Sequence, residues 1–249
     1  MDAVTIALEL AVQDPAGVRI AREVGAARVE LTQALALGGL TPSPATLELA
    51  LEAAGEEGPE VHALIRPRAG GFHYDADEIA VSVRDIERAV ATGASGVVVG
   101  ALDASGALDR DAMTRLRDAA GGASVTVHRA IDASTDISSS LETAIGLGLR
   151  RVLTSGGAPT AIDGIETLRA MVATADRRIE IMAGSGVNAG SAAALAATGV
   201  DALHFSAKRT VAAVGGVRLG SADDGIGGYE VTDRDAAFAV RDALGSEAA

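Results

Sequence analysis

The apolar and polar positions of this chain alternate between two periods. Short runs rich in Val, Ile and Leu have the period of two that is typical of strands, and each precedes a longer stretch with the 3.6-residue period of an amphipathic helix. We predict eight strands, in the runs VTIALEL (4–10), GAARVEL (25–31), VHALIRP (61–67), GASGVVVG (93–100), SVTVHRA (124–130), GLRRVLTSGG (148–157), RIEIMAG (178–184) and GVDALHF (199–205).

Helical patterns follow these strands and set the fold class. They lie near 14–24, 43–56, 76–92, 109–120, 136–147, 160–174, 189–198 and 232–244. Strands that alternate with helices form right-handed βαβ units around a parallel sheet, and eight such units are the size of a TIM barrel. An open doubly wound sheet is the alternative, but no G-x-G-x-x-G follows the first strand. We therefore predict an α/β fold, a (β/α)8 TIM barrel, as one domain over residues 1–249.

One segment departs from this alternation of strands and helices. Residues 210–233 form a long, glycine-rich run between the eighth strand and the last helix. Loops of this length inside a compact domain are usually functional or disordered. We predict a flap over the barrel mouth, with a surface excursion or a subunit contact as the alternative.

Composition narrows the range of partners. The 249 residues carry a formal net charge of −13, and only 2% of them are aromatic. Such a chain lacks both the basic surface and the stacking platforms that nucleic acid requires, and it does not favour anionic membranes. There is no cysteine, which excludes disulfides and thiolate metal sites. No apolar run reaches membrane-spanning length and no signal peptide is evident, so we expect a cytoplasmic protein.

Charged residues interrupt several of the predicted strands, each between apolar neighbours. Period-two alternation then directs six side chains into the barrel, namely Glu9, Glu30, Arg66, His128, Glu180 and His204. Buried charges at this density are expected to pair as Glu–Arg and Glu–His networks. Active sites of TIM barrels lie at the carboxyl ends of the strands. Glu30, Arg66 and His128 lie there and are predicted catalytic residues.

The remaining polar positions in the strands have more than one interpretation. For Glu9, a catalytic role and a structural ion pair are equally supported. Glu180 and His62 lie early in their strands, where a structural role is favoured.

Two glycine loops after strands indicate anion binding. TSGG and AGSG leave backbone N–H groups free at helix starts, which is the physical basis of phosphate sites. The predicted anion-binding residues are Gly156, Gly157, Gly184, Ser185, Gly186, Ser206 and Lys208, with Arg68 beside Arg66 as a bidentate clamp. A Schiff-base role for Lys208 is the alternative to a phosphate contact.

Longer motifs identify a family resemblance. RVEL-x-x-AL-x-x-GGLTPS, IRPR-x-G-x-F-x-Y-x-x-DE, VTVHRAID, LTSGGAPTA-x-x-G, IEIMAG-x-GV and HFSAKR occur in this order. In these motifs the chain resembles the CutC family of copper homeostasis proteins from the first strand to the end of the eighth. The resemblance implies a TIM barrel, a cytoplasmic location, a dimer or larger homo-oligomer, and a role in copper handling.

The chain departs from the family pattern at two positions. Thr32 and His73 stand where relatives commonly carry cysteine. Without thiolates, Cu(I) keeps only histidine and methionine as soft ligands. The remaining candidate copper ligands are His73, His128 and His204, together with Met182, and His73 with His128 is a candidate pair.

Three functional hypotheses follow. The first is a CutC-type protein that handles copper. The second is a lyase-like or isomerase-like barrel enzyme that acts on a small anionic or phosphorylated metabolite, with Glu30 and His128 as acid and base. The third is a binding module without chemistry.

Overall fold

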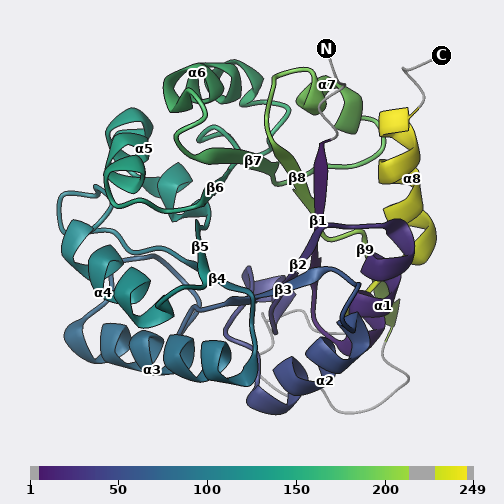
Figure 1. Ribbon diagram of the computed structural model, residues 1–249. Coiled ribbons are helices and arrows are strands. Elements are labelled where there is room, and N and C mark those ends of the chain that lie inside the picture. The colour runs from purple at the N-terminus through teal and green to yellow at the C-terminus, as the bar shows by residue number, and fades with distance from the viewer. Residues whose placement is uncertain (1–5, 213–227, 246–249) are drawn as a thin grey trace.

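The computed structural model describes residues 6–212 and 228–245, and it has the predicted architecture (Figure 1). Eight parallel strands pair in chain order and close into a barrel. They are β1 (Ala7–Val12), β2 (Arg28–Leu31), β3 (Glu60–Leu64), β4 (Gly96–Val99), β5 (Ser124–Val127), β6 (Arg151–Thr154), β7 (Glu180–Gly184) and β8 (Ala202–Phe205). The predicted (β/α)8 TIM barrel is confirmed.

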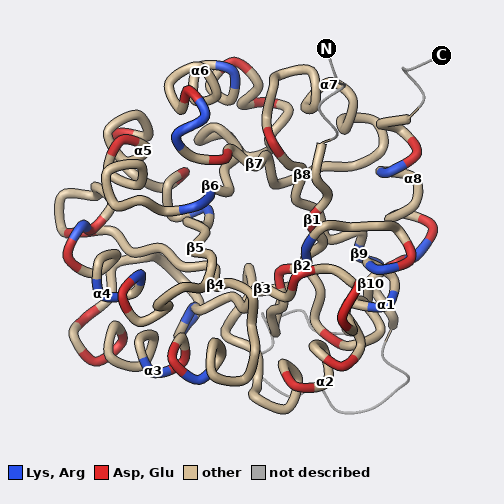
Figure 2. The backbone as a smooth tube through the Cα atoms, in the orientation of Figure 1, with Lys and Arg blue, Asp and Glu red and all other residues tan. Residues whose placement is uncertain are grey.

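The helices surround this barrel (Figure 1). They are α1 (Pro15–Val24), α2 (Pro44–Ala54), α3 (Ala76–Thr92), α4 (Arg110–Ala120), α5 (Ile137–Gly146), α6 (Ile165–Ala175), α7 (Ala192–Ala196) and α8 (Arg234–Gly245), with short 3-10 helices η1 (Leu35–Leu37) and η2 (Arg129–Ala133). No described helix is both long and apolar enough to cross a membrane. Figure 2 shows that acidic and basic residues are spread over the outer helices.

Local chemistry sets the ends of these helices. The Asp75 side chain accepts hydrogen bonds from the first backbone N–H groups of α3. The Glu78 side chain accepts a hydrogen bond from the Asp75 backbone N–H, and the two together make a capping box. Gly25 and Gly93 end α1 and α3 in the left-handed conformation that glycine adopts without a steric cost. These signals explain why the predicted bounds of the longer helices agree with the structure to within a few residues.

Most strands are shorter than predicted, and in β3 and β5 the early end affects the site. β3 ends at Leu64 and β5 at Val127, so Arg66 and His128 lie just beyond the strands. The side chain of His128 instead caps η2 by accepting a bond from Ala130 N. Both residues therefore belong to the loops at the mouth.

The buried residues form two sets, one on each face of the barrel strands. An aliphatic core lies between the strands and the helices. The face of the strands that points into the barrel carries polar groups, since Glu9 pairs in register with Arg28 on one side and His204 on the other. A small apolar cluster of Leu153 and Met182 with Ala202 fills another part of this interior.

The predicted 210–233 loop contains regular structure at both ends. β9 (Lys208–Ala212) and β10 (Gly228–Thr232) pair as an antiparallel ribbon, while residues 213–227 lie outside the described residues. The ribbon lies against α1, where a Cβ added to Gly17 would come within 2.8 Å of Thr232 Oγ1. The described part of the segment thus packs against α1, and the flap over the mouth stays a prediction because residues 213–227 lie outside the described residues.

Candidate active site

A buried ion network joins three adjacent strands inside the barrel. Glu9 has no exposed surface. Arg28 donates from Nε to Glu9 Oε2 at 2.9 Å, and His204 Nδ1 lies 2.9 Å from Glu9 Oε1. The expected pairing of buried carboxylates with arginine and histidine therefore occurs at Glu9.

The network fixes the protonation states of its members. Burial alone would raise the pKa of Glu9, but the hydrogen bond from His204 and the charges of His204 and Arg28 hold it well below its usual range. Burial opposes the charge on His204 too, yet the carboxylates of Glu30 and Glu9 raise its pKa. The arrangement stabilises ionised Glu9 and protonated His204, which donates Nδ1–H to Glu9.

Glu30 has a different environment. It lies two residues beyond Arg28 on the same face of β2 and is 6% exposed. Its Oε2 is buried without a hydrogen-bond partner among the described residues. Burial raises the pKa of Glu30 to about 7; the charge of His204 opposes this rise and the charge of Glu9 adds to it. A carboxyl group of this kind takes up and releases a proton near neutral pH.

His128 is a neutral hydrogen-bond donor at the mouth. Its Nδ1 accepts a bond from Ala130 N at 3.0 Å, which assigns the proton to Nε2 in the neutral ring. Burial, together with the positive charge of Arg66, lowers the pKa of His128 to about 3. Nε2 is buried and has no partner among the described residues. The ring therefore presents an unused N–H, and at neutral pH it does not carry a charge.

Arg66 connects two loops at the mouth. Its Nη1 donates to the carbonyls of Leu37 and Gly39, and its Nη2 donates to the carbonyl of Gly70. No described carboxylate pairs with this guanidinium, and its buried Nε has no partner. Arg66 thus contributes an uncompensated positive charge and one free donor.

These groups line one cavity at the mouth of the barrel. Its volume is about 220 Å³. It is lined by Glu30, Leu35, Gly38, Leu64, Arg66, Phe72, His128, Arg129, Leu153 and His204. The three predicted catalytic residues Glu30, Arg66 and His128 are therefore brought together, with His204 beside them, whereas Glu9 lies below as the partner of His204.

The glycine loop after β6 is already occupied by an internal anion. Asp132 accepts bonds from the backbone N–H groups of Ser155 and Gly157, and from the hydroxyls of Thr154 and Ser155. Gly156 N donates to Thr154 Oγ1. The prediction that Gly156 and Gly157 bind an external anion is wrong, because the carboxylate of this chain fills that site.

Three other predicted anion contacts are engaged elsewhere. Arg68 pairs with Glu78 and donates to the carbonyls of Gly71 and His73, so it does not reach the mouth cavity. Lys208 Nζ bonds Glu230 at 2.6 Å across the β9–β10 ribbon. Ser206 lines a small crevice with Lys208 rather than the mouth.

The loop after β7 is a weaker candidate for anion binding than its sequence indicates. Ser185 has a positive φ of 84° and donates its hydroxyl to the carbonyl of Pro159. Gly184 and Gly186 flank it, but the helix that follows, α7, has only five residues. So short a helix provides little dipole for an anion at its start.

The predicted histidine ligands do not gather into a metal site. His73 is exposed in the loop after β3, and among the described residues only Glu9, Glu30 and His204 hold ligand atoms within 4.8 Å of one another. The two carboxylates of this cluster are hard donors, and its one imidazole is already bonded to Glu9, so the cluster does not suit Cu(I). Met182 Sδ lies 4.0 Å from the cationic Arg28 Nη2, an unfavourable place for a metal ion. The described residues do not form a site of the soft ligands that Cu(I) prefers.

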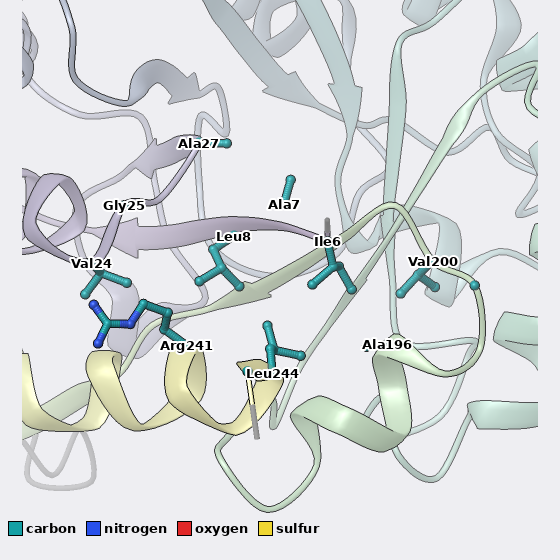
Figure 3. A pocket seen from close by; sticks show the side chains of 12 residues that line it. Ile6, Ala7, Leu8, Val24, Gly25, Ala27, Ala196, Val200, Arg241 and Leu244 are labelled. Atoms are coloured by element: carbon teal, nitrogen blue, oxygen red, sulfur yellow. The ribbon is translucent and has the colours of Figure 1, made fainter. Parts of the chain in front are cut away.

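A larger cavity of about 820 Å³ lies at the other end of the barrel (Figure 3). Apolar side chains dominate it, including Ile6, Leu8, Val24 and Leu244. Among the described residues its lining contains no carboxylate or histidine, so these residues provide no groups for acid–base chemistry. The site is therefore better placed at the mouth.

Sequence reasoning missed two contributors to the mouth. Phe72 packs its ring 4.9 Å from that of His128 and lies under the Arg66 guanidinium at 5.4 Å. Arg129 also lines the mouth and bonds Asp132 and Ser155. Phe72 lies in the motif IRPR-x-G-x-F, and Arg129 and Asp132 lie in VTVHRAID. Each of these residues follows a strand, and this position was the signal that could have placed them at the mouth.

Comparison with known proteins settles the family. The model of the CutC family matches residues 6–209. The chain belongs to the CutC family. The matched region ends within β9, shortly after the eighth strand, where the motifs of the resemblance also end.

Individual relatives agree with this assignment. A family protein CutC from Sinorhizobium medicae is 48% identical over 190 residues, covering 76% of each chain. The family protein CutC of Xanthomonas campestris pv. campestris strain B100 is 47% identical over 207 residues, covering 83% of this chain and 85% of the relative. The crystal structure of CutC from Streptococcus agalactiae has a TM-score of 0.77 at 32% identity and covers 81% of this CutC-family chain and 98% of its own.

More distant structures share only the fold. The thiamine phosphate pyrophosphorylase of Pyrococcus furiosus has a TM-score of 0.61 at 16% identity, covering 99% of this chain. The family name refers to copper homeostasis, and the polar groups at the mouth must be interpreted from their own geometry.

Proposed function

We propose that this CutC-family barrel binds a small carboxylate- or phosphate-bearing metabolite at its mouth and catalyses proton transfer on it. The observation that carries the proposal is Glu30, a buried carboxyl group whose pKa is raised to about 7 and whose Oε2 lacks a partner. Such a group is poised to act as a general base and then as a general acid at neutral pH.

The surrounding groups support this chemistry. Glu30 removes a proton from the carbon next to a carbonyl group; the electron pair of the C–H bond forms the C=C bond of an enolate, and the π pair of the carbonyl moves onto its oxygen. The Nε2–H of His128 donates to that oxygen, and Arg66 supplies the positive charge for the anionic group of the ligand. Glu30 then returns the proton to carbon or oxygen, so atoms and charges balance without another reactant.

The size of the cavity limits the substrate. About 220 Å³ is below the range of drug-sized ligand pockets, which starts near 300 Å³. The ligand is therefore a metabolite of few heavy atoms. A 2-oxo acid such as pyruvate is a suitable probe because it carries a carboxylate next to a carbonyl group.

The test is deuterium exchange of pyruvate in D2O, followed by proton NMR. We expect the parent chain to accelerate exchange at the methyl carbon and Glu30→Gln to lose the acceleration by about 10²- to 10⁴-fold. Glu57→Gln, an exposed glutamate, is the matched control. Equal exchange in Glu30→Gln and the parent would contradict the assignment of the base.

Copper is the competing interpretation, and a separate measurement distinguishes it. A Cu(I) competition titration should show no stoichiometric uptake that depends on histidine, because the described residues bring only one histidine, together with two hard carboxylates, into a cluster. Stoichiometric uptake that is lost when His73, His128 and His204 are all changed to Ala would overturn this expectation. A cytoplasmic location and assembly into a dimer or larger homo-oligomer stay predictions from the family resemblance.

A further inference from the structure

A second polar cavity lies at the end of the barrel opposite the mouth. The first residues of five strands open into it, namely Arg28, Glu60, Ser124, Arg151 and Glu180. Its volume is about 610 Å³, and the helix-ending turns at Gly121 and Gly148 form part of its rim. None of the acid–base groups of the mouth lines this cavity.

Positive charge is concentrated here, in a chain whose formal net charge is −13. Arg28, Arg117, Arg150 and Arg151 line the cavity. Arg150 and Arg151 share one carboxylate, because each places Nη2 2.5 Å from a different oxygen of Glu180. One negative charge therefore serves two guanidinium groups.

The other charged groups around the cavity are largely engaged with each other. Arg117 pairs with Asp118 at 2.5 Å, and Arg28 pairs with the buried Glu9. Glu60 is the remaining acidic residue in the lining, and its side chain is 59% exposed on the rim. Arg150 and Arg151 are therefore the two guanidinium groups of the lining that share a single carboxylate.

Buried donors in this region lack partners. Arg151 is 3% exposed, and its Nε has no hydrogen-bond partner among the described residues. Ser124 Oγ is also buried and unpartnered. An unsatisfied buried donor is costly, and a donor on a charged group is more so. An anion that reached these donors would satisfy them. Burial and the positive charge of Arg28 lower the pKa of Arg151, and an anion in the cavity would offset this repulsion between the two guanidinium groups.

The rim leaves room for a ligand to enter. A Cβ added at Gly121, Gly122 or Gly148 would meet no atom within 4 Å. The cavity is therefore open at its rim, and the donors of the arginine side chains lie at its base.

We propose that this cavity at the amino-terminal end of the barrel binds a phosphate group. Guanidinium groups match phosphate oxygens with paired, charge-assisted hydrogen bonds. Phosphate also offers more acceptor oxygens to the two guanidinium groups that share Glu180 than a single carboxylate does. The site is separate from the mouth and does not depend on the proposed proton-transfer activity.

Calorimetric titration of the full chain with inorganic phosphate tests the proposal. We expect saturable binding that weakens by about tenfold or more in Arg150→Gln, because a charge-assisted hydrogen bond is lost. Arg150 is suited to substitution because its side chain is 65% exposed, so the variant should fold. Arg84→Gln, with a side chain 75% exposed on α3, is the matched control and should bind like the parent.

Further arms identify the source of the phosphate and the location of binding. Glycerol phosphate and adenosine monophosphate, titrated in parallel, show whether an organic phosphate binds more tightly than the inorganic ion. Glu30→Gln should leave phosphate binding unchanged. Absence of saturable binding, equal binding by Arg150→Gln and the parent, or tighter binding in Glu30→Gln, where an anion at the mouth would no longer be repelled, would each overturn the proposal.

Discussion

At the scale of single residues, two neighbouring carboxyl groups on adjacent strands have opposite electrostatic environments. Glu9 is held ionised by Arg28 and His204, whereas Glu30 has no hydrogen-bond partner for Oε2. Pairs of titratable groups whose environments separate their pKa values are typical of acid–base sites. The paired member positions His204, and the unpaired member is the one available for proton transfer.

The unpaired state of Glu30 has a consequence for stability. Its pKa is raised from 4.5 to about 7 in the folded chain, so the folded form binds this proton more tightly than the unfolded form does. The contribution to stability is complete below about pH 4.5 and is lost as the pH rises through about 7, at a cost of about 3 kcal/mol.

We therefore predict that Glu30→Gln stabilises the fold at alkaline pH. Above pH 7 its free energy of unfolding should exceed that of the parent by up to about 3 kcal/mol, and the difference should vanish below about pH 4.5. Denaturant unfolding at a series of pH values measures this. Glu57→Gln should change little at any pH, because surface substitutions stay within about 0.5 kcal/mol. A destabilised Glu30→Gln at pH 8 would show that the ionised carboxylate is satisfied.

At the scale of elements, the loop after β6 is organised by a residue from the preceding βα unit. Asp132 in η2 is linked to Thr154, Ser155 and Gly157 and pairs with Arg129 at 2.9 Å. The loop therefore keeps its shape through a side chain that is distant in sequence.

We predict that Asp132→Ala destabilises the chain by about 3 kcal/mol or more, because several buried donors lose their acceptor together. Formate should restore part of this stability in the variant but not in the parent, since it places a carboxylate in the space left free. Thermal unfolding with formate, compared with chloride at the same ionic strength, measures the rescue. Equal stability of Asp132→Ala and the parent would contradict this role for the carboxylate.

At the scale of the whole molecule, the sequence was informative about the barrel and less so about its loops. Period-two runs and helix-ending glycines such as Gly25 and Gly93 are local signals, so the order of the elements could be predicted. The approach of Asp132 to the TSGG loop is a tertiary contact with no local signal. The sequence could indicate that Glu30, Arg66 and His128 share the mouth, but it could not show that Glu30 would remain unpaired.

Because Glu30 Oε2 lacks a described hydrogen-bond partner, the binding of an anionic ligand at the mouth is also coupled to the uptake of a proton by Glu30. An anion entering the mouth repels the Glu30 carboxylate, so the complex takes a proton from solution near pH 7, where about half of these groups are ionised. The measured enthalpy of pyruvate binding should then vary with the ionisation enthalpy of the buffer, and Glu30→Gln should abolish the variation. Buffer-independent enthalpies in the parent would show that binding leaves the charge of the site unchanged.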